Sequence, residues 1–161
     1  MSKQFTFVYQ CPPIGMLPAA ADAAGRTGAY KSLRNCSGKV RVACRVNQGN
    51  AAQVTFSLLQ ATSSGGAGSK AISVAPIYYN ADTSVGDALT AQTAAVNFQT
   101  DVAVKDKIVV FEFDPADVLD IANGFNHIAV QTSASNVANI TSADMEYLGR
   151  YQQQVPPASE V

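Results

Sequence analysis

The segment Lys107–Thr132 constrains the fold more than any other part of the chain. Its first part, from Lys107 to Phe113, carries large apolar residues on both alternating faces, which is typical of a strand in the middle of a sheet. A second strand is predicted over Phe125–Gln131, with Ile128 and Val130 on its inner face. The segment therefore predicts two core strands that are close together in the sequence.

Between these two strands the sequence predicts one short helix, over about 115–123. Asp114 is an N-cap residue, Pro115 suits the first helical position, and Gly124 ends the helix. Three apolar residues, Val118, Leu119 and Ile121, are expected to pack the helix against the core.

The clearest alternation in the chain lies at Lys39–Val46. Val40, Val42, Cys44 and Val46 are expected to face the core, and the outer face then carries Lys39, Arg41 and Arg45. Two interpretations of this row of cations remain open: a basic stripe for an acidic partner, or a solvated face whose cations pair with carboxylates on the next strand. The residue pattern favours the second interpretation.

Shorter apolar or β-branched segments predict further strands at 4–10, 53–62, 71–80, 96–100 and 145–150, and polar connections separate them. The loops 63–69 and 133–144 are rich in Ser, Asn and Gly. About eight strands and one helix predict an all-β fold, an antiparallel β-sandwich of the jelly-roll type. We expect residues 1–161 to form a single domain that ends in an extended tail, 151–161.

Residues 11–38 show neither a strand period nor a helix period and predict a long N-terminal loop or arm. Ile14, Met16 and Leu17 lie in this segment and would be poorly solvated if they were exposed to water. Either the arm lies on a neighbouring subunit, or it folds over the core of its own chain.

Composition excludes several classes of partner. Only 14% of the residues are charged and the net charge is −1, so the clustered cations needed to bind nucleic acid or an anionic membrane are missing. No apolar run of about 18 residues exists that could span a bilayer. The N-terminus lacks the apolar core of a signal peptide, which predicts folding in a cytoplasm.

The inventory of reactive side chains is equally poor. His127 is the only histidine, and the three cysteines, Cys11, Cys36 and Cys44, form no CxxC pair. Capping and dipole roles explain Asp114 and Asp117, and the spacing of these two with Asp120 matches no calcium loop. The pair Asp144 and Glu146 is commonplace on an exposed strand. We therefore expect no enzymatic activity and no catalytic, cofactor-binding or metal-binding residues.

The C-terminal half of the chain resembles a known class of protein. The order VVFEFDPADVLD, then NGFNHIAVQTSASNVANITSADMEYLGRY, is similar to small β-sandwich virion proteins of tailed bacteriophages, over roughly Ala71–Tyr151. This resemblance implies a capsid decoration (cement) protein, bound outside the major capsid lattice and assembled in the host cytoplasm. It implies the major capsid protein and further copies of the same chain as partners. A tail or head–tail connector component is an alternative.

A decoration protein is expected to contact its neighbours through its arm and its tail. The residues predicted to form this interface are Ile14, Met16, Leu17, Tyr30, Leu33, Tyr151 and Val155. The rival hypothesis is a carbohydrate-binding jelly-roll module, with tyrosines such as Tyr78, Tyr79 or Tyr147 around a concave face.

Overall fold

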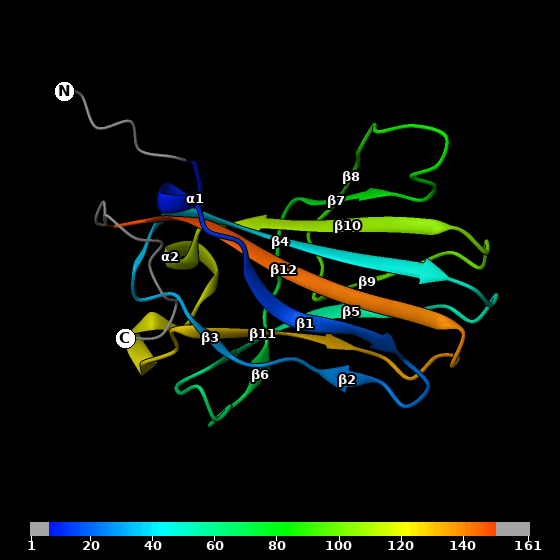
Figure 1. Cartoon of the computed structure of the whole chain (residues 1–161). Coiled ribbons are helices and arrows are strands. Elements are labelled where there is room, and N and C mark those ends of the chain that lie inside the picture. Colours follow the sequence, from blue (N-terminus) through cyan, green and yellow to red (C-terminus); the bar gives the residue numbers. More distant parts are fainter. Residues whose placement is uncertain (1–6, 151–161) are drawn as a thin grey trace.

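A computed structural model describes residues 7–150 as a sandwich of two antiparallel β-sheets (Figure 1). The first sheet contains β1 (Ile14–Ala21), β12 (Asn139–Gly149), β4 (Cys36–Gln48), β10 (Asp106–Phe113), β7 (Ile77–Asn80) and β8 (Thr90–Gln92), in that spatial order. The second contains β2 (Arg26–Thr27), β11 (His127–Thr132), β5 (Thr55–Ala61) and β6 (Lys70–Ala71). Two further strands complete it: β3 (Lys31–Ser32) pairs with β11, and β9 (Asn97–Gln99) pairs with β5.

The order of the strands is that of a jelly roll. The chain starts in the first sheet with β1, crosses to β2 and β3, returns with β4, and crosses again to β5. The next strands, β6 and β9, both pair with β5, and the β7–β8 hairpin lies between them in the sequence and joins the first sheet. The chain then alternates between the sheets once more, through β10, β11 and β12. This is the double Greek key of two four-stranded sheets, to which the β7–β8 hairpin has been added. The predicted fold class is confirmed.

The strongest sequence patterns fold as expected. Val40, Val42, Cys44 and Val46 face the core from β4, and Val109, Phe111 and Phe113 face it from β10. The remaining large core side chains come from both sheets and include Phe56, Leu58, Ile77, Ile128, Val130 and Met145. The strand β10 lies between β4 and β7, as its apolar faces predict.

The predicted helix is present but broken in two. An α-helical turn, α2 (Pro115–Val118), begins at the N-cap Asp114, whose carboxylate accepts a hydrogen bond from the Ala116 amide. A 3₁₀ turn, η1 (Ile121–Asn123), follows and ends at Gly124, whose φ of 82° is left-handed. Leu119 is buried, whereas Ile121 is exposed, so the expected contact between Ile121 and the core is wrong.

The predictions for the N-terminal region need correction. Of the strand expected at 4–10, the described part is a helical turn, α1 (Phe7–Gln10), that pairs with no strand. The segment 11–38, predicted as a loop, contains β1, β2 and β3. Register shifts after Gly15 and after Leu17 break the period of two in β1, so that the neighbours Met16 and Leu17 are both buried.

Two further boundaries differ from the prediction. Residues 139–144, expected in a loop, form the first half of β12, where the inward positions are Asn139, Thr141 and Ala143. This half of the strand has polar residues inside and Ile140 outside, the reverse of the usual pattern. The strand expected at 71–80 is divided between β6 and β7, because the chain crosses from the second sheet to the first within it.

Candidate functional site

The side chains considered for chemistry mostly have structural roles. Asp114 caps α2, and Asp120 accepts hydrogen bonds from Lys70 and Asn123. Within residues 7–150, no three His, Cys, Asp or Glu side chains gather as they would around a metal ion. His127 is buried on β11, opposite Ser32 of β3.

The thiols are poorly suited to act as nucleophiles. Burial raises the pKa of Cys36 to about 11, and it also raises the pKa values of Cys11 and Cys44. The thiolate is the nucleophilic form of cysteine, and these shifts keep the protonated form dominant at neutral pH.

The row of cations on β4 pairs with acids on the neighbouring strands. Lys39 binds Glu112 of β10 at 2.7 Å, and Arg41 binds Glu146 of β12. These contacts confirm the solvated-face interpretation for two of the three cations. The third, Arg45, lines a shallow groove with Ile140 and Thr83 on the outer face of the first sheet.

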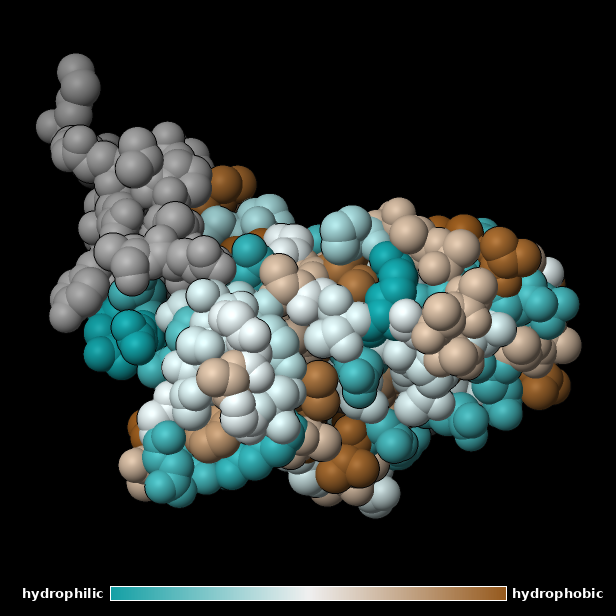
Figure 2. All heavy atoms as spheres, turned by 90° about the horizontal axis from the view of Figure 1, so that it is seen from below, coloured by the Kyte–Doolittle hydropathy of each residue, from teal (hydrophilic) through white to brown (hydrophobic). Residues whose placement is uncertain are grey.

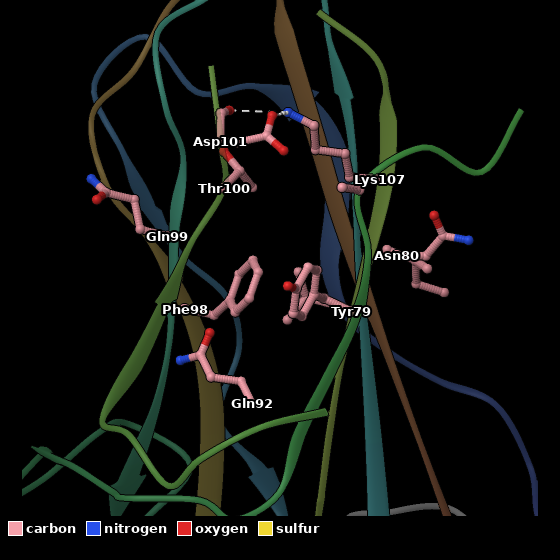
Figure 3. Close-up of a pocket in the computed structure, with 11 residues that line it drawn as sticks. Tyr79, Asn80, Gln92, Phe98, Gln99, Thr100, Asp101 and Lys107 are labelled. Atoms are coloured by element: carbon pink, nitrogen blue, oxygen red, sulfur yellow. Dashed lines mark hydrogen bonds and ion pairs between the residues drawn. The ribbon is translucent and has the colours of Figure 1, made fainter. Parts of the chain in front are cut away.

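A pocket of about 200 Å³ opens between the two sheets, beneath the β7–β8 hairpin (Figure 3). The rings of Tyr79, from β7, and Phe98, from β9, lie 4.9 Å apart between their centroids and form one wall. Asp101 and Lys107 form the facing wall, and Gln92 lies beside Phe98. Such a cavity, with an aromatic wall and several polar groups, is the usual form of a small-molecule site.

Lys107 is buried, and hydrogen bonds to several acceptors hold its ammonium in place. The Nζ atom donates to Gln48 Oε1 at 2.9 Å, to Asp101 Oδ1 at 2.7 Å and to the Ala103 carbonyl at 2.6 Å. The hydrogen bond from Lys107 lowers the pKa of Asp101. The Lys107 ammonium therefore stabilises the loop 100–105, whereas the half-exposed Asp101 carboxylate faces the pocket (Figure 3).

The pocket residues Gln92, Asp101 and Lys107 are not among the residues predicted from the sequence. A signal for Lys107 exists in the sequence, because it shares the inward face of β10 with Val109, Phe111 and Phe113. A lysine at an inward position must find buried acceptors. Gln92 and Asp101 carry no comparable signal. The β7–β8 hairpin brings Gln92 to the pocket, and the loop 100–105 folds Asp101 onto Lys107.

A second candidate site is an exposed apolar surface at one end of the sandwich, here named the loop end. It is the right-hand end in Figure 1, where β4 ends and β5, β10 and β12 begin. The side chains that define it are 39% to 82% exposed: Val85, Val102, Val104, Val137 and Ile140. Figure 2 shows apolar residues interspersed with polar ones at this end.

The loop end is tied together across separate segments. The Asp82 carboxylate pairs with Lys105 at 2.5 Å, and the Thr83 amide donates to the Asp106 carbonyl at 2.9 Å. Ile140 of β12 is registered with Asn47 of β4. These contacts hold the hairpin connection and the loop 100–105 against the ends of the core strands.

The residues predicted to form an interface have different locations. Met16, Leu17 and Leu33 are buried in the core of their own chain, which agrees with the alternative that the segment folds over its own core. Ile14 and Tyr30 are half-buried, and the Tyr30 hydroxyl shares a hydrogen bond with Ser69. Tyr151 and Val155 lie outside the described residues, as does the predicted tail.

No protein-family model and no curated protein matches this chain. Among solved structures, the SPBc2 prophage-derived protein YomS aligns with 84% of this chain and 91% of its own, with 9% identity and a TM-score of 0.47. A similarity of this size supports no inference about the present chain. None of the helices within residues 7–150 has the length and hydrophobicity needed to cross a membrane.

Proposed function

We propose that this chain is a non-enzymatic structural protein of a bacteriophage virion, and specifically a decoration protein that binds the outside of the capsid lattice. The resemblance of residues 71–151 to such proteins motivates the proposal, and the loop end is the observation that carries it. Here three loops and the start of a core strand present exposed aliphatic side chains from a rigid sandwich. A partner that covered these aliphatic side chains would remove apolar surface from water, which stabilises a protein contact.

The structure argues against residues 14–33 as the contact with a neighbouring subunit. These residues include β1, which pairs along β12, so their deletion would remove a strand of the first sheet. The loop end takes their place as the proposed contact with the major capsid protein. The tail after Arg150 stays a proposed second contact.

Binding to purified capsids that lack the protein tests the proposal. The double substitution Val102→Asp with Val104→Asp should reduce occupancy at least tenfold, because charged side chains would have to be desolvated in the contact. Ile121→Asp, at an exposed position near the opposite end, is the matched control and should bind like the natural chain. Equal occupancy for all three proteins, or absence of the natural chain from purified particles, would contradict the proposal.

Carbohydrate binding is the second candidate function, and the interlayer pocket favours it. Of the tyrosines in the rival hypothesis, Tyr79 lines this pocket, whereas Tyr147 is buried in the core. The aromatic wall, the Gln92 amide and the Asp101 carboxylate are groups that contact the faces and hydroxyls of a sugar ring. The volume of about 200 Å³ is below the roughly 300–1,000 Å³ of most ligand pockets, so the pocket would hold a single ring.

A glycan-binding screen tests carbohydrate binding, and NMR titration with each monosaccharide that binds in the screen then locates the site. Gln92→Ala should weaken binding, whereas Asn97→Ala, whose exposed side chain is not among the pocket residues, should not. A screen without a hit, or shifts that are equal in the two variants, would remove this candidate.

A further inference from the structure

The two outer strands of the first sheet, β1 and β8, are protected to very different degrees. An edge strand presents backbone N–H and C=O groups that can pair with another chain, and proteins usually block such edges. The difference between these two edges points to a specific contact.

The edge formed by β1 is blocked in three ways. Pro18 has no amide hydrogen to donate, and two register shifts distort the strand. Arg26 then occupies carbonyl groups of this strand: its Nη1 donates to Pro18 O at 2.8 Å and its Nη2 to Ala20 O at 3.1 Å. An incoming strand would have to displace this guanidinium.

The edge formed by β8 has none of these protections. Its pairing with β7 runs without a register shift through Thr90, Ala91 and Gln92. The sequence from 88 to 100 contains no proline and no charged residue. Thr90 and Ala91 are exposed, so the strand is accessible.

The second sheet offers no comparable edge among the described residues. One edge of this sheet consists of β2 and β3, which are only two residues long each and are separated by residues outside any strand. On the other side the hairpin insertion separates β6 from β9. Within residues 7–150, each copy of the chain therefore presents one regular, unblocked edge.

We propose that β8 pairs antiparallel with β8 of a second copy of this chain, joining the two first sheets into one continuous sheet. Pairing about Ala91 places Ala91 opposite Ala91 and Thr90 opposite Gln92 in both copies, so no like charges and no bulky side chains meet. Such a contact has two-fold symmetry, and one open edge per copy closes the assembly at a dimer. A strand of three residues gives a small interface, so the dimer is weak and dependent on concentration.

Sedimentation equilibrium of the full chain tests the proposal through a charge exchange. The natural chain should show a monomer–dimer equilibrium, and Ala91→Lys and Ala91→Glu should each be monomeric, because like charges would face each other across the two-fold axis. An equimolar mixture of the two variants should dimerise again. Ala19→Lys, at an exposed position on the blocked β1 edge, is the matched control and should behave like the natural chain.

A monomeric natural chain at the highest concentration reached would overturn the proposal, as would an Ala91→Lys variant that dimerises normally. Hydrogen exchange of the natural chain gives a second measurement that needs no variant. The amides of 90–92 should exchange at least several-fold more slowly at high than at low protein concentration, and unchanged rates would also overturn the proposal. These results do not depend on the virion function, whose test uses capsids and the loop end.

Discussion

At the scale of single residues, the inside of this sandwich contains a buried ionic cluster that ties three segments together. Asp22 is fully buried and accepts hydrogen bonds from Arg26 Nε at 2.9 Å, from Thr132 Oγ1 at 2.8 Å and from Thr141 Oγ1. Arg26 also donates to the Thr141 carbonyl. The cluster thereby fastens the turn between β1 and β2 onto β11 and β12.

We expect Asp22→Asn to lower the free energy of unfolding by about 3–5 kcal/mol, because the Arg26 guanidinium would lose its buried counter-ion. Urea denaturation measures this change. Lys39→Met breaks the exposed pair with Glu112 and is the control, for which little or no loss is expected because solvent screens the pair. Equal losses for the two variants would contradict the structural role of the Asp22 cluster.

The acid sensitivity of the loop end depends on Asp82. Hydrogen bonds from the Lys105 ammonium and the Ser84 hydroxyl lower the pKa of Asp82 from 3.8 to about 2. Because the folded-state pKa lies below the unfolded value, the contribution of this pair to stability is complete above about pH 4 and is lost as the pH falls towards 2. Carboxyl NMR titration should give a midpoint near 2 for Asp82, and Lys105→Met should raise it.

At the scale of elements, the helical turn α2 depends on its N-cap. Asp114 accepts from the Ala116 amide at 2.9 Å, whereas Asp117 lies in the first turn and is exposed. We expect Asp114→Ala to cost about 1 kcal/mol in thermal or urea unfolding, the usual value for a lost cap. Asp117→Ala removes only a favourable interaction with the helix dipole and should cost a few tenths of a kcal/mol. A larger loss for Asp117→Ala would show that the capping role is misassigned.

The elements also differ in how well the sequence predicts them. The strands β4, β5, β10 and β11 have apolar side chains on their inner faces, so a period of two identifies them. The strand β12 begins with inward polar residues that bond to Asp22, Asn50 and Ala52, and its pattern resembles that of a loop. In β1 the bulges remove the period. Both failures arise because tertiary hydrogen bonds, and not hydrophobic alternation, define these strands.

At the scale of the whole molecule, the β7–β8 hairpin is an insertion into one jelly-roll strand. In an antiparallel pair of strands, the numbers of any two facing residues have the same sum. This sum is 130 where β5 pairs with β6 and 154 where β5 pairs with β9, so the two registers differ by 24 residues. The Ile72 amide still bonds to the Leu58 carbonyl, which places the insertion at 73–96. Because 24 is even, the strand resumes with the same faces inward.

We therefore expect a variant that lacks residues 73–96 to keep the jelly-roll fold, because Ile72 would then be followed by Asn97 in correct register along β5. The variant loses the buried side chains of Val74 and Ile77, each worth roughly 1.5–3 kcal/mol, out of a typical stability of about 5–15 kcal/mol. Dispersed amide NMR signals together with a lowered melting temperature would confirm this expectation. A variant of equal length that lacks residues 49–72, and so removes β5 from the middle of the second sheet, should not fold.

The sequence by itself determined the fold class, the main core residues and the position of the helical turns, because these depend on local alternation and capping. It also favoured a solvated face for the β4 cations, which the ion pairs of Lys39 and Arg41 confirm. Only the tertiary structure decided that Met16, Leu17 and Leu33 belong to the core, and that Gln92 and Phe98 line one pocket with Lys107. Each of these depends on contacts between segments far apart in the chain, which no local pattern encodes. The same holds for the one unblocked edge at β8, since an edge exists only when all the strands of a sheet have been placed.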